Sequence, residues 1–65
     1  MKETVLEDIY YFYQDNSHDL EQVGLFILEE YSRHLNWELE DYELDNILEI
    51  LSEVENLEEF LDRLL

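Results

Sequence analysis

The chain of 65 residues carries 19 Asp and Glu against three Lys and Arg, a formal net charge of −16, which opposes direct binding to nucleic acid or to an anionic membrane surface. The absence of cysteine excludes disulfides, thiolate zinc sites and thiol nucleophiles. Because 46% of the residues are hydrophobic and 14% aromatic, more than a disordered acidic tail contains, we expect residues 1–65 to fold as a single acidic helical domain.

The first predicted element is a helix over residues 3–14. The absence of proline and the single glycine leave few places for strand turns. When successive residues are placed about 100° apart around a helix axis, the apolar residues lie on one face. They are Val5, Leu6, Ile9, Phe12 and Tyr13. The polar segment QDNSHD interrupts this pattern, and Asn16 or Ser17 is the expected N-cap of the next helix.

A second helix is predicted over residues 18–35. Its apolar stripe repeats at intervals of three and four residues and comprises Leu20, Val23, Gly24, Ile27, Leu28, Tyr31 and Leu35. Leu25 and Phe26 lie on the other side, which predicts a central helix covered on two faces; the alternative is an exposed patch for a partner. Gly24 inside a helix predicts close approach of a neighbouring backbone.

A third helix is expected over residues 39–52, after a turn near Asn36 and Trp37. Its buried face comprises Leu44, Ile47, Leu48 and Leu51. Asn56 with Glu59 resembles a capping box, and would start a short fourth helix with inward Leu57, Phe60, Leu61, Leu64 and Leu65. The alternative is one unbroken helix over residues 39–64 that pairs with another chain.

We favour the break between the third and fourth segments. The expected fold is therefore all-α, a small bundle of three helices with a short fourth helix. The expected state is a monomer or a homodimer. No apolar run approaches 18 residues, and the start of the chain lacks a signal-peptide pattern, so a cytoplasmic location is expected.

The motifs that could carry chemistry are incomplete. Asp15, Ser17 and Asp19 have the first spacings of a calcium-binding EF-hand loop, but Leu20 and Phe26 stand where that loop needs glycine and glutamate. His18 and His34 lie sixteen residues apart, which does not suit zinc. Paired carboxylates perform acid–base catalysis only in a suitable cleft, and so small a helical protein offers little cleft. We expect no metal, no cofactor and no enzymatic activity.

The charge is concentrated in the C-terminal half. Residues 37–55 contain eight carboxylates and no cation, and four of them recur at intervals of four residues: Asp41, Asp45, Glu49 and Glu53. Together with Glu55–Glu59 and Glu58–Asp62, they make five like-charge pairs that destabilise helices by about 1–2.5 kcal/mol in total. Solubility alone requires a net charge of only about 2 to 8 in magnitude. The excess negative charge therefore requires an explanation.

Three interpretations compete. We favour a protein inhibitor that mimics phosphates in the basic nucleic-acid site of a DNA- or RNA-handling protein. In composition the chain resembles, at the level of a class, the small acidic anti-restriction or anti-CRISPR proteins of phages and mobile elements. An antitoxin or immunity protein that neutralises a cationic toxin is the alternative, and a merely solvated acidic face is the third. The predicted partner-binding residues are Tyr11, Glu38, Asp41, Tyr42, Asp45, Glu49, Glu53, Glu55, Glu58, Glu59 and Asp62. Trp37 is expected to cap the core.

Overall fold

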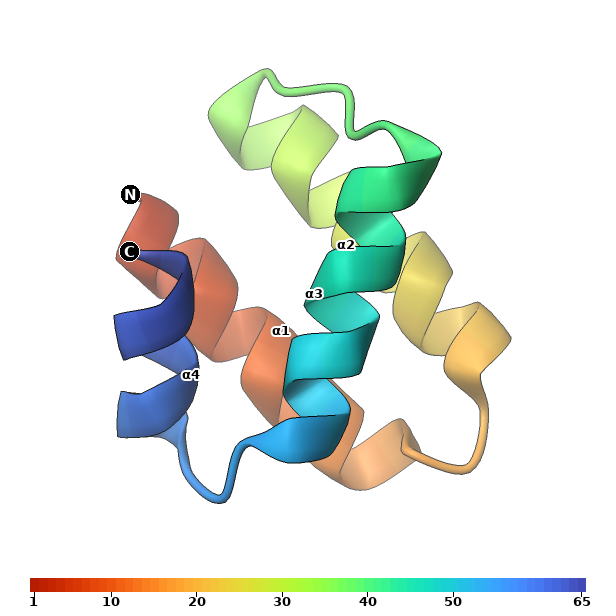
Figure 1. Cartoon of the computed structure of the whole chain (residues 1–65). Helices are drawn as coiled ribbons and strands as arrows, with labels where there is room; N and C mark the ends of the chain where they lie inside the picture. Colours follow the sequence, from red (N-terminus) through yellow and green to blue (C-terminus); the bar gives the residue numbers. More distant parts are fainter.

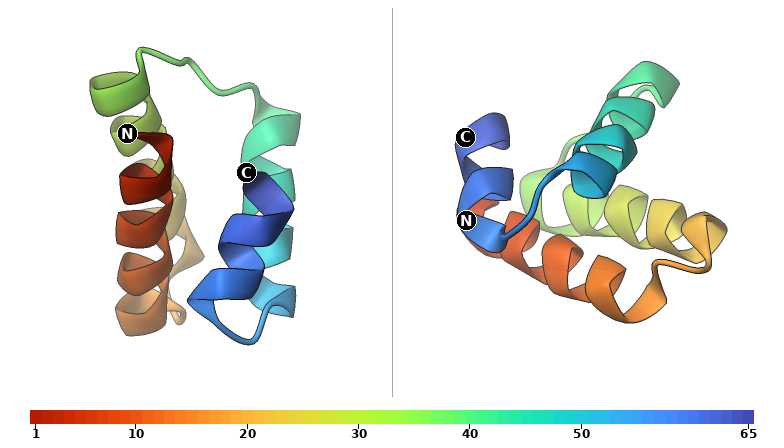
Figure 2. Two further views of the ribbon diagram at one scale, coloured as in Figure 1. Left: turned by 90° about the vertical axis from the view of Figure 1, so that its left-hand side faces the viewer. Right: turned by 60° about the horizontal axis from the view of Figure 1, so that its bottom comes forward.

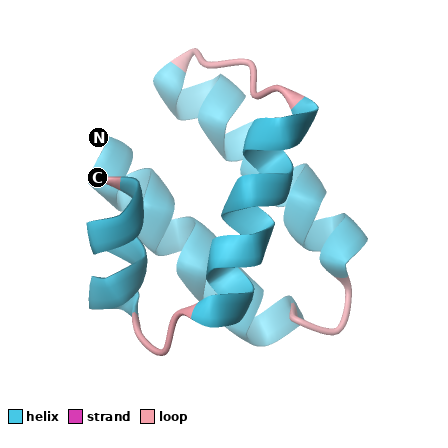
Figure 3. Cartoon of the chain, in the orientation of Figure 1, coloured by secondary structure: helices cyan, strands magenta, loops and turns pink.

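The computed structural model describes residues 1–65 and contains four helices. They are α1 (Lys2–Asn16), α2 (Leu20–Leu35), α3 (Asp41–Glu53) and α4 (Leu57–Leu64). All regular structure is helical (Figure 3), which confirms the predicted all-α bundle with a fourth helix. None of the four has both the length and the apolar character that crossing a bilayer requires.

The helices form two layers, each an antiparallel pair. α1 and α2 make the first layer and have the most extensive contact of any two helices (Figure 1). α3 and α4 make the second layer, in which α3 packs against α2 and α4 packs against α1 (Figure 2). Both chain termini lie at the same end of the molecule (Figure 1).

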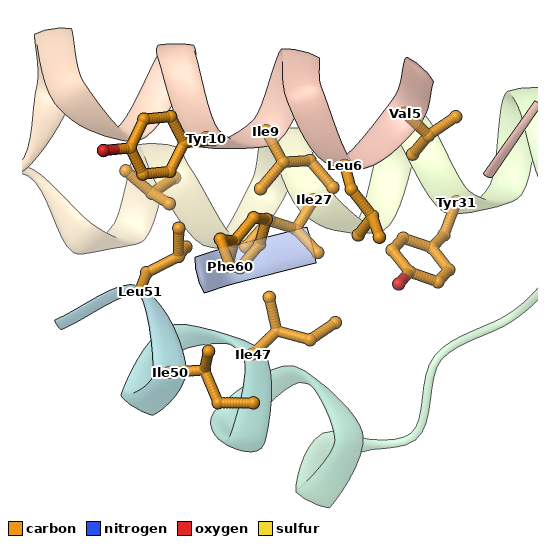
Figure 4. Packing of buried hydrophobic residues seen from close by; sticks show 11 residues of the cluster. Val5, Leu6, Ile9, Tyr10, Ile27, Tyr31, Ile47, Ile50, Leu51 and Phe60 are labelled. Atoms are coloured by element: carbon orange, nitrogen blue, oxygen red, sulfur yellow. The ribbon is translucent and has the colours of Figure 1, made fainter. Parts of the chain in front are cut away.

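The core lies between the two layers and contains eleven buried hydrophobic residues. Each helix contributes to it: Val5, Leu6, Ile9 and Tyr10 from α1, Val23, Ile27 and Tyr31 from α2, Ile47, Ile50 and Leu51 from α3, and Phe60 from α4. The Phe60 ring lies in the middle of the cluster (Figure 4) and is 0% exposed. Its centroid is 5.9 Å from that of Tyr10 of α1. Phe60 is the one fully buried residue that α4 contributes, while Leu57, Leu61 and Leu64 of α4 pack against the core and are partly buried.

The start of α2 differs from the prediction. α1 continues to Asn16, whose side-chain amide donates to the Phe12 carbonyl at 2.9 Å, so this residue closes α1 and does not cap α2. The N-cap is Asp19, whose carboxylate accepts from the Gln22 N–H at 3.2 Å. The prediction of Asn16 or Ser17 was wrong because the chain needs a two-residue turn after α1 before it can reverse.

The connections between α2 and α3 and between α3 and α4 lie where the sequence predicted them. Asn36 ends α2 in the left-handed conformation (φ 51°, ψ 43°), which asparagine tolerates. Between α3 and α4 the backbone is extended at Val54, and Asn56 caps α4 by accepting from the Glu59 N–H at 2.8 Å. The Glu59 carboxylate accepts from the Glu55 N–H at 3.3 Å, one residue earlier than in a standard capping box. The break is confirmed, and the unbroken helix over residues 39–64 is excluded.

Several positions predicted to be buried are exposed. Leu20 is 53% exposed because it lies in the first turn of α2, beyond the reach of the second layer, and Leu28 lies at the edge of the same helix. Leu65 follows the end of α4 and is also exposed. Leu25 is 56% exposed, so the prediction that α2 is covered on two faces was wrong. Tyr10, which the predicted apolar face did not include, is buried and packs against Phe60.

Gly24 does not make room for a neighbouring backbone. A Cβ atom placed on it would lie 3.8 Å from Leu44 Cδ2, which is ordinary van der Waals contact with a side chain of α3. Its φ is not positive, so neither steric crowding nor backbone conformation requires glycine there. The sequence-based explanation of Gly24 as a close-approach site was therefore wrong.

The first testable prediction follows from this geometry. Gly24→Ala should stabilise the fold by about 0.5–1 kcal/mol, because alanine reduces the entropy of the unfolded chain and fits the helical backbone. In a domain of this size the expected rise in Tm is about 4–8 °C per kcal/mol. Thermal and urea unfolding followed by circular dichroism would measure it. A lower Tm would show that the contact with Leu44 is tighter than 3.8 Å implies.

Candidate functional site

The acidic residues of α3 lie on its solvent side. Ile47, Ile50 and Leu51 turn the opposite side of the helix into the core. This orientation leaves a row of four carboxylates exposed, here called the acidic ladder: Asp41, Asp45, Glu49 and Glu53. Successive members are separated by about 6 Å along the helix axis, since four residues each rise by 1.5 Å. The structure thus brings together the four residues that the sequence pattern singled out.

One member of the acidic ladder has a cationic partner. Arg63 of α4 donates to the Glu53 carboxylate, with an Nη1–Oε1 distance of 2.9 Å. Sequence analysis missed this pair because the two residues are ten positions apart and meet only when α4 folds back along α3. Asp45 and Glu49 have no hydrogen bond or ion pair through their side chains. They are therefore the unneutralised middle of the ladder.

Other acidic residues stabilise helix starts. The Glu43 carboxylate accepts from the Glu40 N–H at 2.9 Å, and Glu59 accepts from the N–H of Glu55. Asp41 and Glu58 lie in the first turns of α3 and α4, where a negative charge interacts favourably with the helix dipole. Part of the acidic excess therefore has a local role in folding.

The acidic residues of α4 do not continue the ladder directly. Arg63 faces α3, and at about 100° per residue Glu58 and Asp62 are turned away from that side. Both are exposed, as are Glu38 in the connection before α3 and Glu55 in the connection after it. The predicted acidic residues therefore occupy two rows and not one continuous surface.

The two tyrosines predicted as interface anchors lie in different places. Tyr42 is 73% exposed in the first turn of α3, beside Asp41. Tyr11 is also exposed, but it belongs to α1 and packs edge-on against Tyr10, with ring centroids 5.6 Å apart. The second half of α1 and the first turn of α3 lie at opposite ends of the molecule (Figure 1). Only Tyr42 accompanies the acidic ladder.

A hollow of about 400 Å³ lies next to Tyr42, at the end of the molecule where the connection between α2 and α3 passes both chain termini. This aromatic groove is lined by Lys2, Tyr31, Trp37, Tyr42, Glu43 and Leu64, among others. Sequence analysis did not find it, because its lining comes from all four helices and from the connection. Tyr42 and Glu43 belong to both the groove and the first turn of α3, so the groove adjoins the acidic ladder.

The aromatic groove has an ordered floor and a cation at its side. Trp37 packs edge-on against Tyr31 with a centroid separation of 5.9 Å, and the Lys2 ammonium lies 5.6 Å from the indole centroid. Figure 4 shows the Tyr31 hydroxyl pointing away from α1. Burial, and secondarily the negative charge of Glu43, raise the pKa of the Tyr31 phenol. The floor of the groove is therefore a neutral phenol beside a carboxylate.

A second, smaller hollow of about 330 Å³ lies on the first layer. Phe12 and Phe26 stack there with centroids 4.1 Å apart, next to the exposed Leu25. This explains why Phe26 is half-buried although it lies outside the apolar stripe of α2. The hollow has no cluster of charged groups and lies on a different face from the acidic ladder.

The structure contains no group of three or more acidic or histidine side chains arranged to hold a metal ion. Comparison of the chain with protein-family models, with curated proteins and with solved structures finds no match. The acidic ladder and the aromatic groove are therefore the features of this chain that bear on its function.

The raised pKa of Tyr31 gives a prediction about alkaline stability. Below its ordinary value of 10.0 the phenol is protonated in both folded and unfolded states. At higher pH the unfolded chain releases the proton first, so the free energy of unfolding falls until the folded pKa is passed. Urea unfolding between about pH 9 and pH 11 should show a shallower fall for Tyr31→Phe than for the wild type. Glu43→Gln should make the fall in the free energy of unfolding less steep only in part, because it removes the smaller of the two causes of the raised Tyr31 pKa.

A third prediction concerns self-repulsion along α3. Asp45→Asn with Glu49→Gln removes the three like-charge pairs of the ladder and should stabilise the fold by about 0.6–1.5 kcal/mol at low salt. The gain should shrink as salt screens the charges. Glu53 is left unchanged, because substitution would also break its pair with Arg63. A gain that is independent of salt would point to helix propensity and not to repulsion.

Proposed function

We propose that this protein is an inhibitor that binds the basic nucleic-acid site of a DNA- or RNA-handling protein and presents carboxylates in place of phosphates. The observation that carries the proposal is the unneutralised middle of the acidic ladder: Asp45 and Glu49 are exposed, without partners, and fixed at regular spacing on a helix. Nothing within the fold requires these two charges, and they destabilise the helix that carries them.

The dimensions support this interpretation. α3 has 13 residues, and is therefore about 20 Å long and, with its side chains, about 10–12 Å wide. A basic groove that accommodates a nucleic acid strand would accept a helix of this size. At the start of α3 the acidic ladder begins with the exposed Asp41, and the exposed Glu38 precedes it in the connection from α2. The pair between Glu53 and Arg63 marks its other end.

The mimicry is electrostatically incomplete, and this has a measurable consequence. The acidic ladder offers one carboxylate per about 6 Å, whereas duplex DNA carries one charge per about 1.7 Å of axis. A lower charge density condenses fewer counterions, so less is gained by releasing them. The affinity of the inhibitor for its target should therefore fall less steeply with salt than the affinity of the nucleic acid for the same site.

The test has two stages. The protein is used as bait in a lysate, and the basic protein that it retains is purified. The binding of that protein to duplex DNA or RNA is then measured at several salt concentrations with and without the inhibitor. We expect the inhibitor to compete with the nucleic acid for the target, and we expect the inhibitor to be favoured as the salt concentration rises. Asp45→Asn with Glu49→Gln should weaken binding of the inhibitor to the target by about tenfold or more, which corresponds to about 0.7 kcal/mol per lost charge pair.

The matched control is Asp8→Asn with Glu21→Gln. It removes the same number of charges from exposed positions of α1 and α2, outside the acidic ladder. A general electrostatic effect would weaken binding equally in the two double variants, and the proposal would then be wrong. The proposal predicts that the control variant binds nearly as well as the wild type.

The antitoxin or immunity role is the second candidate. The aromatic groove beside the acidic ladder favours it, because a recess of about 400 Å³ with aromatic walls suits side chains of a protein partner and has no counterpart in a phosphate backbone. In that case the retained protein would be a small toxin, and added nucleic acid would not compete for it.

A further inference from the structure

The aromatic groove has three features of a site for a cationic side chain. Its walls include Trp37 and Tyr42, of which Tyr42 is mostly free of other contacts. The half-buried Glu43 contributes a carboxylate, and only one of its oxygens is used by the Glu40 N–H. The neighbouring positions Glu38, Glu40 and Asp41 are exposed acids. Aromatic faces next to carboxylates attract cations through the ring quadrupole and through direct Coulomb interaction.

The protein itself demonstrates that one wall accepts a cation. The Lys2 ammonium lies 5.6 Å from the centroid of the Trp37 ring, within the range of a cation–π interaction. Lys2 is also the only cation that lines the groove. An incoming cationic side chain would therefore compete with Lys2 for the indole and would take the free oxygen of Glu43.

We propose that the aromatic groove is a socket for an arginine side chain of the cationic partner, placed between Trp37 and Tyr42 and paired with Glu43. This proposal rests on the proposed function, since it assumes that the acidic ladder meets a basic protein. Arginine fits better than lysine because its planar guanidinium stacks on aromatic rings, is more weakly hydrated and can donate to a carboxylate in a fixed geometry. Because Tyr42 and Glu43 begin α3, a segment inserted there would continue along the acidic ladder.

Trp37 is the only tryptophan, so its fluorescence reports directly on the groove. The probes are hexa-arginine and hexa-lysine peptides of equal charge, titrated at about 150 mM salt with emission and calorimetry recorded together. For the wild type we expect hexa-arginine to change the Trp37 emission and to bind about 3- to 10-fold more tightly than hexa-lysine.

Two double variants separate the groove from the ladder. Tyr42→Ala with Glu43→Gln should abolish the preference for arginine; glutamine retains the acceptor that caps α3, so the helix start is preserved. Asp45→Asn with Glu49→Gln should weaken both peptides in equal proportion and leave the preference unchanged. Circular dichroism of each variant verifies that the fold is intact.

A substitution at Lys2 should strengthen the binding of hexa-arginine, whereas the two double variants should weaken it. Lys2→Gln removes the internal competitor and should tighten hexa-arginine binding more than Arg33→Gln does. Arg33→Gln is the matched control, because it deletes one positive charge whose side chain pairs with Glu29 outside the groove. Equal effects of the two variants would indicate long-range electrostatics and would contradict the socket.

The remaining outcomes overturn one proposal or both. Equal binding of the two peptides with unchanged Trp37 emission, but weaker binding to the ladder variant, would refute the socket and leave the proposed function standing. A preference for arginine that survives in the groove variant would place the arginine elsewhere. A dimer in sedimentation equilibrium that the groove variant dissociates would assign the groove to a second copy. Failure of both peptides to bind would count against the proposed function itself.

Discussion

Burial of Phe60 is the interaction on which the second layer depends. α4 has only eight residues and contributes one fully buried side chain, which lies among residues of the first layer and of α3. Because α4 is held there, Arg63 reaches Glu53, and Leu64 reaches the aromatic groove. Without this contact α3 would have one neighbour fewer, and neither the orientation of the acidic ladder nor the position of Leu64 in the lining of the groove would be fixed.

The fold tolerates its negative charge by placing it unevenly. Acids at helix starts, such as Asp19, Glu43 and Glu59, accept backbone hydrogen bonds, and others in first turns interact with helix dipoles. The few cations are all engaged: Arg33 with Glu29, Arg63 with Glu53 and Lys2 with the Trp37 ring. Among the acids that have no partner, Asp45 and Glu49 are successive members of one row in the middle of α3, whereas others, such as Asp8, lie on other helices. Solubility alone would not require two charges to lie four residues apart on one helical face, where they repel each other.

Local patterns predicted most of the fold, because helix periodicity and capping depend on residues within one turn of each other. The four helices, the turn at Asn36 and the break before α4 all followed from such patterns. One error was local, since the N-cap of α2 is Asp19 and not Asn16 or Ser17. The other errors concern contacts between distant segments. Leu20 and Leu25 lie where no second-layer helix covers α2, and Gly24 faces a side chain of α3 and not its backbone. The ladder was visible in the sequence, whereas its pairing with Arg63 and the aromatic groove require the tertiary arrangement.

The two halves of the candidate surface suit different stages of binding. Unpaired carboxylates on an exposed helix act over about a Debye length, near 8 Å at physiological salt, and so accelerate encounter with any basic surface. They cannot select one partner, since every nucleic-acid site is basic. A recess with aromatic walls and one available carboxylate oxygen acts only at contact, and it discriminates by shape and by the geometry of the donor. Because Tyr42 and Glu43 lie in the same helical turn as Asp41, the proposed function would join attraction and selection at the start of α3. Under that proposal, specificity in so small a protein would not require a large interface.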